Sequence, residues 1–499
     1  MNYISKLPGF FAKISLPVIA AVSMSFGISM TSCSTFKPSE FSVQGMSVIY
    51  PDYMDVTVPQ GIAPLNFMYT GKVANPVTEF SAGDVRHTIR GREVSIPASK
   101  WKALCDAAVG GAISVKSSNP DTSWCIYVSP DKIDYGLNYR LIEPGYEVYS
   151  KMGIYERELA TCNQRPLIEN TEFNGCVNCH SYNRADPNDF SLHIRGMHGA
   201  TLIRHGGETV AYNTKTPETI GSCVYPYWHP SGKYIAYSTN STRQGFHVDS
   251  EKLIEVFDSA SDMLIYDIEN NSLVTNDSLS LPDYWETFPA FSPDGSTLYF
   301  CRAAKKEIPG GLKDVRYNLC SVSFDAESGR PGTDVRVLVD AEAEGYSISF
   351  PRPSHDGKYL IYTRSDYGNF SIWHHEADLY CLNLETGESR PMSEINSPDT
   401  ESYHSFSSNG RWMVFSSRRD DGLFTRLYIT HFDENGCATK PFMLPQKNPA
   451  EYYTKLFFSY NVPEFVSAPV EMSHHDNQRI IRSKERKQMS FRLYFFGKY

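Results

Sequence analysis

The chain has 499 residues, a formal net charge of −10 at pH 7, and a composition that is 41% hydrophobic and 13% aromatic. This length exceeds one ordinary domain and suits two or three. The aromatic content favours β-structure, since aromatic side chains fit pleated, half-buried surfaces. The acidic balance argues against a nucleic-acid partner, because phosphate binding needs clustered lysine and arginine.

The N-terminus has the features of an export signal. Basic residues precede an apolar run over residues 16–30, which ends in Met30-Thr31-Ser32-Cys33. The run is short for a transmembrane helix and typical of a signal-peptide core. Small residues ending in cysteine resemble the lipobox of bacterial lipoproteins, although Met30 stands where leucine is usual. We therefore expect Cys33 to carry a lipid that anchors the protein to the outer membrane of the bacterial envelope; an ordinary signal peptide is the alternative.

One pattern repeats through the second half of the chain. Each copy has an aromatic residue seven positions before a glycine and another aromatic five positions after it. The glycines are separated by 63, 62 and 53 positions. The four copies are residues 225–237, 288–300, 350–362 and 403–415.

Each copy predicts a tight turn followed by a strand. Asp294-Gly295, Asp356-Gly357 and Asn409-Gly410 are pairs that favour turns with positive φ, and an apolar strand follows each. Several short strands per unit at regular spacing are typical of a β-propeller. The copies resemble the TolB-type repeat, most closely at residues 291–300. The resemblance covers about residues 200–460 and implies an all-β, TolB-like propeller.

We expect five or six blades. Residues 201–214 read as the outer hairpin of an earlier blade, and either residues 457–465 or an N-terminal strand closes the ring. Strand-like segments before residue 160 predict a small β-sandwich-like domain. The expected organisation is a signal peptide over 1–33, a β-rich domain over 34–160, a cofactor segment over 161–200, the propeller over 201–465 and a basic tail over 466–499.

The cofactor segment contains Cys176-Val177-Asn178-Cys179-His180, a C-x-x-C-H motif. In c-type cytochromes two thiols bond the haem vinyl groups and the adjacent histidine ligates the iron. We therefore expect one haem c on Cys176, Cys179 and His180. A disulfide between the cysteines and a zinc site are the alternatives.

A second iron ligand should follow closely in the sequence. His193 lies between apolar neighbours in an extended run and is the preferred candidate, with Met197 as the alternative and a five-coordinate iron also open. His374-His375-Glu376 is a further possible metal trio. Adjacent residues of a strand point to opposite faces, however, so the two histidines should not share a metal if the segment is extended.

The segment around the motif is similar to uncharacterised Bacteroidetes lipoproteins that join a C-x-x-C-H sequence to TolB-type repeats. The similarity rests on residues 139–146, 175–182 and 193–196. It implies the architecture and the envelope location of a lipoprotein. From the C-x-x-C-H motif in an exported chain we expect a protein that passes electrons to a periplasmic or envelope partner. The alternative is a haem-free propeller that binds a protein or glycan. No G-x-S-x-G, Walker or Rossmann motif is present, so no catalytic residue is predicted.

Overall fold

The computed structural model describes residues 47–143, 150–247 and 252–494. The predicted signal peptide and Cys33 lie outside these residues. None of the helices in the described ranges has the length and apolar character needed to cross a membrane.

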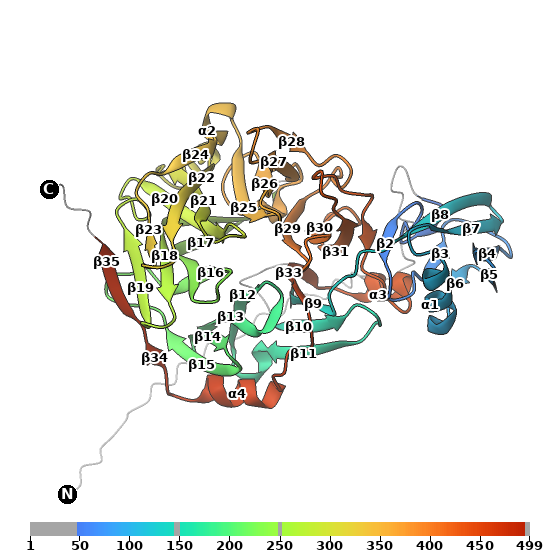
Figure 1. Cartoon of the computed structure of the whole chain (residues 1–499), viewed down its shortest axis with the longest axis horizontal. Coiled ribbons are helices and arrows are strands. Elements are labelled where there is room, and N and C mark those ends of the chain that lie inside the picture. Colours follow the sequence, from blue (N-terminus) through green and yellow to red (C-terminus); the bar gives the residue numbers. More distant parts are fainter. Residues whose placement is uncertain (1–46, 144–149, 248–251, 495–499) are drawn as a thin grey trace, which may run out of the picture. The chain divides into compact units, whose positions relative to one another are not determined.

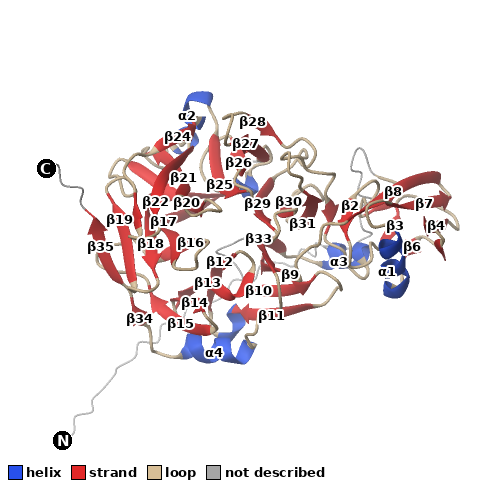
Figure 2. Ribbon diagram, viewed as in Figure 1, coloured by secondary structure: helices blue, strands red, loops and turns tan. Residues whose placement is uncertain are grey.

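The N-terminal part consists of two sheets and one helix around a shared apolar core (Figures 1 and 2). One sheet contains β1 (Ile49–Tyr50), β3 (Phe67–Tyr69) and β6 (Glu93–Val94). The other runs in the order β2 (Thr57–Pro59), β8 (Asp121–Ser129), β7 (Ala112–Ser118), β4 (Val77–Ala82) and β5 (Val85–Arg90). Helix α1 (Ala98–Ala107) buries Trp101, Leu104 and Cys105. These residues occupy positions i, i+3 and i+4, which lie on one face of a helix and form an apolar stripe.

Six further sheets surround a central axis as the blades of a β-propeller, with one strand of each nearest the axis (Figure 1). From the axis outward, the first three blades are β33 (Ser459–Val466), β9 (Gly136–Ile142), β10 (Met152–Glu158) and β11 (Gln164–Glu169); β12 (Gly175–Asn183), β13 (Asp186–Gly196), β14 (Ala200–His205) and β15 (Glu208–Asn213); and β16 (Cys223–Trp228), β17 (Tyr234–Phe246), β18 (Ile254–Asp267) and β19 (Ser272–Asn276).

The other three blades follow in chain order. They are β20 (Tyr284–Phe291), β21 (Thr297–Ala304) and β22 (Asn318–Asp325) with β23 (Arg330–Pro331) and β24 (Arg336–Val339); β25 (Ser347–Pro353), β26 (Tyr359–Ser365), β27 (Asp378–Asn383) and β28 (Ser389–Pro391); and β29 (Glu401–Phe406), β30 (Trp412–Ser417), β31 (Arg426–His431) and β32 (Phe442–Met443). Short helices in the described connections are α2 (Ala341–Glu344), α3 (Pro449–Lys455), η1 (Asn170–Glu172), η2 (Leu312–Asp314) and η3 (Ser371–Trp373).

The first blade joins the two ends of the propeller. Its inner strand β33 comes from the C-terminal part of the chain and pairs antiparallel with β9. The two closing segments that the sequence left as alternatives therefore both contribute. Residues 201–214 form the outer strands β14 and β15 of the second blade, as the sequence predicts.

The structure draws the domain boundaries differently from the sequence analysis. The propeller begins at β9, so it includes residues 136–200, which were assigned to the N-terminal domain and the cofactor segment. The basic tail is structured: α4 (His474–Arg482) buries Ile481 against the first two blades. Strands β34 (Lys487–Gln488) and β35 (Ser490–Tyr494) then add in parallel to β15 and β19. The outer edges of the second and third blades are thereby paired, which protects them from pairing with strands of other chains.

Each inner strand carries the same β-bulge. In all six, the register against the next strand shifts at a residue whose φ lies between 48° and 54°; β12 has a second shift, between Tyr182 and Asn183. Such bulges bend a strand and re-aim its side chains. The six residues, from the first blade to the sixth, are Val462, Cys179, Tyr225, Phe288, Phe350 and Tyr403.

Candidate functional site

The bulge residues surround a cavity of about 370 Å³ at one mouth of the propeller channel. All six of them line it, together with the residue that follows each bulge in most blades. The β17–β18 hairpin also lines this cavity, through Thr242, Arg243, Gln244 and Val256. A volume of this size, enclosed by rigid strands, lies in the range of small-ligand sites.

Four of the six bulge positions hold aromatic rings that contact one another in succession. Ring centroids are 4.7 Å apart for Tyr225 and Phe288, 4.2 Å for Phe288 and Phe350, and 4.9 Å for Phe350 and Tyr403. Cys179 and Val462 complete the circle with smaller side chains. The circle is therefore packed on four sides and less filled on the side of the first two blades.

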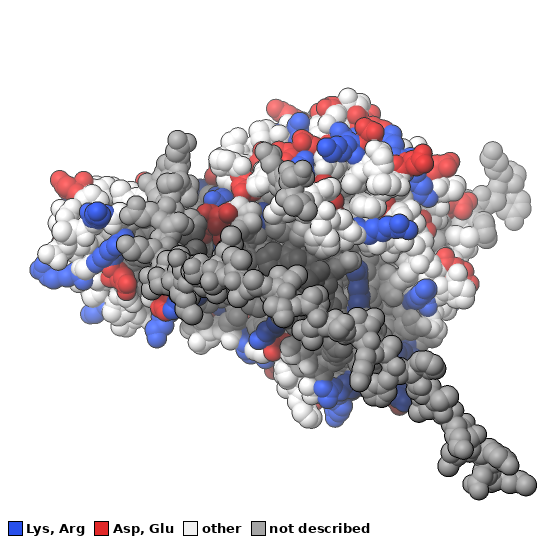
Figure 3. All heavy atoms as spheres, turned by 180° about the vertical axis from the view of Figure 1, so that it is seen from behind, with Lys and Arg blue, Asp and Glu red and all other residues white. Residues whose placement is uncertain are grey.

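The cavity is lined by four arginines and a single carboxylate. The arginines are Arg140, Arg195, Arg243 and Arg352, and the carboxylate is Glu464. Both signs of charge occur across the outer face drawn in Figure 3, whereas the cavity lining is predominantly basic. The basic lining also contrasts with the net charge of −10 on the whole chain.

Arg352 and Glu464 lie where this cavity meets the rest of the channel. They also line a second cavity, of about 230 Å³, on the side of the inter-strand turns. Arg352 stacks over the Tyr227 ring at 5.1 Å. Burial raises the pKa of Glu464 to about 7, although Arg352 works in the opposite direction. At neutral pH the carboxyl is therefore partly protonated, which makes the cavity more positive.

The C-x-x-C-H motif lies on β12, the inner strand of the second blade. Cys176, Cys179 and His180 all line the 370 Å³ cavity, so the structure brings the three predicted side chains to one place. Cys179 is the bulge residue and is buried, and burial raises its pKa. Cys176 is partly buried.

His180 has a counterpart in the sixth blade. His180 Nε2 lies 3.3 Å from the Asn138 carbonyl oxygen, and His404 Nε2 lies 3.0 Å from the Ile361 carbonyl oxygen. Each acceptor belongs to the preceding blade and pairs with the residue two positions after that blade's bulge. Burial lowers the pKa of His180 to about 4 and that of His404 to about 3, so both are neutral. No C-x-x-C sequence precedes His404, so this contact belongs to the propeller repeat.

These contacts are compatible with a metal-ligating histidine, but the propeller repeat accounts for them equally well. A ligating histidine gives one ring nitrogen to the metal and uses the other as a hydrogen-bond donor. His180 directs Nε2 at the Asn138 carbonyl, and its buried Nδ1 has no hydrogen-bond partner among the described residues. The Nδ1 of His404 is in the same condition. The unpaired nitrogen is therefore a feature of both blades and does not point to iron.

The predicted second ligands lie elsewhere. His193 is buried on β13, where its Nδ1 lies 3.1 Å from the Thr201 hydroxyl, and it does not line the cavity. Met197 is 87% exposed. Within the described ranges, no group of three or more His, Cys, Asp and Glu side chains is placed to hold a metal ion.

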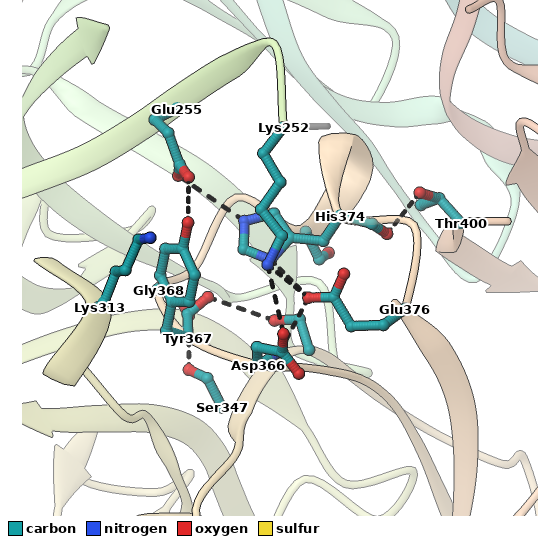
Figure 4. Close-up of polar contacts among 12 residues, drawn as sticks. Lys252, Glu255, Lys313, Ser347, Asp366, Tyr367, Gly368, His374, Glu376 and Thr400 are labelled. Carbon is teal, nitrogen blue, oxygen red and sulfur yellow. Dashed lines mark hydrogen bonds and ion pairs between the residues drawn. The ribbon is translucent and has the colours of Figure 1, made fainter. Parts of the chain in front are cut away.

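A second polar cluster surrounds His374 (Figure 4). His374 is buried, with its Nδ1 3.1 Å from Glu376 and its Nε2 3.7 Å from Glu255 on β18. Burial opposes its charge, but the two carboxylates outweigh burial and raise its pKa. Tyr367 donates to Glu255, and Lys252 pairs with Glu376 at 2.8 Å. The cluster ties the β17–β18 hairpin to the fifth blade and thereby fixes one wall of the cavity.

His375 makes a different contact, although residues 374–376 lie in the connection between η3 and β27 and not in a strand. It pairs with Asp399 at 2.9 Å and is 41% exposed at its side chain. The predicted trio therefore separates into a buried ion-paired histidine and a surface ion pair.

Comparison with known proteins identifies no family. No family model matches the chain. No curated protein matches it either. Solved structures show a distant similarity to β-propeller proteins.

Three of these structures illustrate the range. An oligogalacturonate lyase from Vibrio parahaemolyticus is 14% identical, with 57% of this chain and 84% of that chain covered and a TM-score of 0.32. The periplasmic gluconolactonase of Pseudomonas aeruginosa is 14% identical, with coverages of 67% and 100% and a TM-score of 0.36. Prolyl oligopeptidase B from Galerina marginata is 10% identical, with coverages of 77% and 54% and a TM-score of 0.34.

Proposed function

We propose that this protein is a lipid-anchored binding protein of the bacterial envelope, with a haem-free propeller that holds a small ligand at the channel mouth. The observation that carries the proposal is the 370 Å³ cavity, to which all six blades contribute a bulge residue. Sites of this size suit a small molecule or a glycan fragment. Export and anchoring rest on the sequence around Cys33.

The strands that form the cavity hold their side chains in a fixed arrangement. Each bulge sits between hydrogen-bonded stretches of an inner strand, and two of the three ring contacts between bulge residues are edge to face. A ligand entering such a site would meet groups that are already ordered. Binding would then cost little conformational entropy, which favours affinity.

The test uses the two blades whose bulge residues are not aromatic. Cys179→Phe places at the second blade the side chain that Phe288 and Phe350 already hold at the same φ. The new ring should fill part of the cavity, so ligand binding should be lost while the fold is kept. Val462→Phe makes the matched change in the first blade. Thermal shift against a library of small molecules and glycan fragments, with circular dichroism as the control, measures both.

A folded Cys179→Phe protein that binds every hit as tightly as the wild type would overturn the proposal. Cys437→Ser is the matched control, since Cys437 is exposed and lies outside the cavity. This control should bind as the wild type does.

Electron transfer through a haem c on Cys176, Cys179 and His180 is the competing function. It is supported by the position of all three side chains on one cavity, whereas the contact of His180, which His404 repeats without a C-x-x-C sequence, does not favour it. Expression in a host with haem-attachment machinery, followed by intact mass and a haemochrome spectrum, decides between the two. A mass higher by one haem would replace our proposal. The Cys33→Ala variant, labelled with a fatty-acid analogue in parallel, tests the anchor and should take up no label.

A further inference from the structure

We infer that the ligand of the channel-mouth cavity is a small ring-shaped organic oxyanion, whose charge is held by arginines and whose ring lies against the aromatic wall. This inference rests on the proposed function and names the ligand class of the same site.

The first argument is the convergence of positive charge. Arg140 is on β9, Arg195 on β13, Arg243 on β17 and Arg352 on β25, so four different blades each supply one guanidinium to one cavity. The lining contains one carboxylate, Glu464. An acidic chain with a basic cavity concentrates anions there, because low-dielectric walls focus the field.

The second argument concerns what these arginines already bind. Among the described residues, no carboxylate lies within ion-pair distance of Arg243 or Arg352. The recorded contacts of Arg352 are the Tyr227 ring and a hydrogen bond of 3.1 Å to the Pro351 carbonyl. A guanidinium has five donors in a planar fork that matches a carboxylate or a phosphate. Both guanidinium groups therefore have N–H groups that could donate hydrogen bonds to an oxyanion.

The third argument is the wall beside these arginines. Tyr225, Phe288, Phe350 and Tyr403 line the same cavity, and prolines follow three of the six bulges on it. Flat aromatic surfaces favour a ligand with a planar or ring-shaped body over a bare inorganic ion. Anionic head and ring-shaped body together define the class.

The experiment compares probes that differ mainly in charge. D-glucuronate with D-glucose tests a carboxylate, D-glucose 6-phosphate with D-glucose tests a phosphate, and benzoate with benzamide tests an aromatic acid. Isothermal titration at low ionic strength measures each on the full chain. We expect an anionic probe to bind at least about tenfold more tightly than its neutral partner.

The arginine variants assign the binding to this cavity. Arg243→Gln changes an exposed side chain at the mouth, and Arg352→Gln changes one where the cavity meets the rest of the channel. Each variant should bind the anionic probe at least about tenfold more weakly than the wild type does. Arg336→Gln is the control, because Arg336 is exposed, pairs only weakly with Asp334 at 3.7 Å and lies outside the cavity.

Two results would overturn the inference. One is that no anionic probe binds better than its neutral partner; the other is that Arg243→Gln and Arg352→Gln both leave binding unchanged. If neutral probes bind and Cys179→Phe abolishes that binding, the ligand-binding function stands and only the charge assignment falls. If Cys179→Phe leaves all binding intact, the proposed function falls as well.

Discussion

Two turn glycines offer a matched pair for testing how the blades pack. Gly295 and Gly357 occupy equivalent turns with φ of 77° and 71°. A Cβ added at Gly295 would lie 2.2 Å from His229 Nε2 of the preceding blade. A Cβ added at Gly357 would meet nothing closer than Pro293 Cδ, at 3.9 Å. The two alanine variants therefore share the backbone strain but differ in the steric clash.

The magnitudes follow from these contacts. A left-handed φ costs an alanine about 1–2 kcal/mol, which is the expected effect of Gly357→Ala. In Gly295→Ala the buried His229 must also move. It then loses its 3.1 Å contact with the Gly295 carbonyl and its edge-on packing at 4.9 Å against Phe291. These losses add about 1–3 kcal/mol, so Gly295→Ala should cost about 2–5 kcal/mol.

Urea denaturation followed by tryptophan fluorescence measures the free energy of unfolding of both variants. Their unfolding midpoints can be compared directly when the dependence of that free energy on urea concentration is similar. The double variant His229→Ala/Gly295→Ala removes the clash. Relative to His229→Ala, the added alanine should then cost no more than Gly357→Ala does. Equal midpoints for Gly295→Ala and Gly357→Ala would refute the contact between blades.

Three further predictions concern the core and the pH dependence. Phe291 is 1% exposed and packs between the third and fourth blades, so Phe291→Ala should lower the free energy of unfolding by about 3–5 kcal/mol. Lys305→Ala changes an exposed side chain and should be nearly neutral in the same denaturation assay. Burial raises the pKa of Asp258 to about 7 despite hydrogen bonds from Asn240 and Asn369, so the native state keeps a proton that the unfolded chain releases near pH 4. Stability should fall as pH rises from about 4 to 7, and Asp258→Asn should flatten that fall; an unchanged slope of unfolding free energy against pH would contradict this. Because Glu464 protonates near pH 7 while His180 and His404 stay neutral, an anionic probe should bind more tightly at pH 6 than at pH 8, and titration of Glu464→Gln should show no such change.

The sequence predicts the propeller because its turns are chemically explicit. The glycines of Asp294-Gly295 and Asn409-Gly410 have φ of 77° and 69°, and aromatic residues recur at fixed distances from them. Trp228 and Phe291, each four residues before a turn glycine, both pack between blades. Phe291 contacts His229 of the preceding blade, and Trp228 stacks with His205 of the second blade at 6.1 Å.

The second blade escapes that pattern. Cys179-His180 stands where three other blades have an aromatic residue followed by proline. Its turn contains Arg184 and Ala185 at φ of 48° and 63°, where the third to sixth blades have glycine. The match of Cys179-His180-Ser181-Tyr182 to Tyr403-His404-Ser405-Phe406 is the signal that could have placed it. Cys176 and Cys179 complete a C-x-x-C-H motif, so the sequence predicts a cofactor site in this segment and not a blade of the propeller.

The cavity could not be predicted from the sequence. Its four arginines are spread from residue 140 to residue 352 on four blades, and each occupies an ordinary strand position. Only the circular arrangement of the blades brings them together. The first blade was hidden for a related reason, since its strands come from opposite ends of the propeller segment.

The pairing of β33 with β9 has a consequence for how the protein is made. The strand β9 is synthesised roughly 300 residues before the strand that completes its sheet. At about 5–20 residues per second, β9 waits on the order of 15–60 s with one edge unpaired. Unpaired edges recruit other strands, so a nascent chain held at this stage is open to aggregation and proteolysis. A translation stop a few codons before Ser459 should therefore yield a degraded product, even though five complete blades precede it.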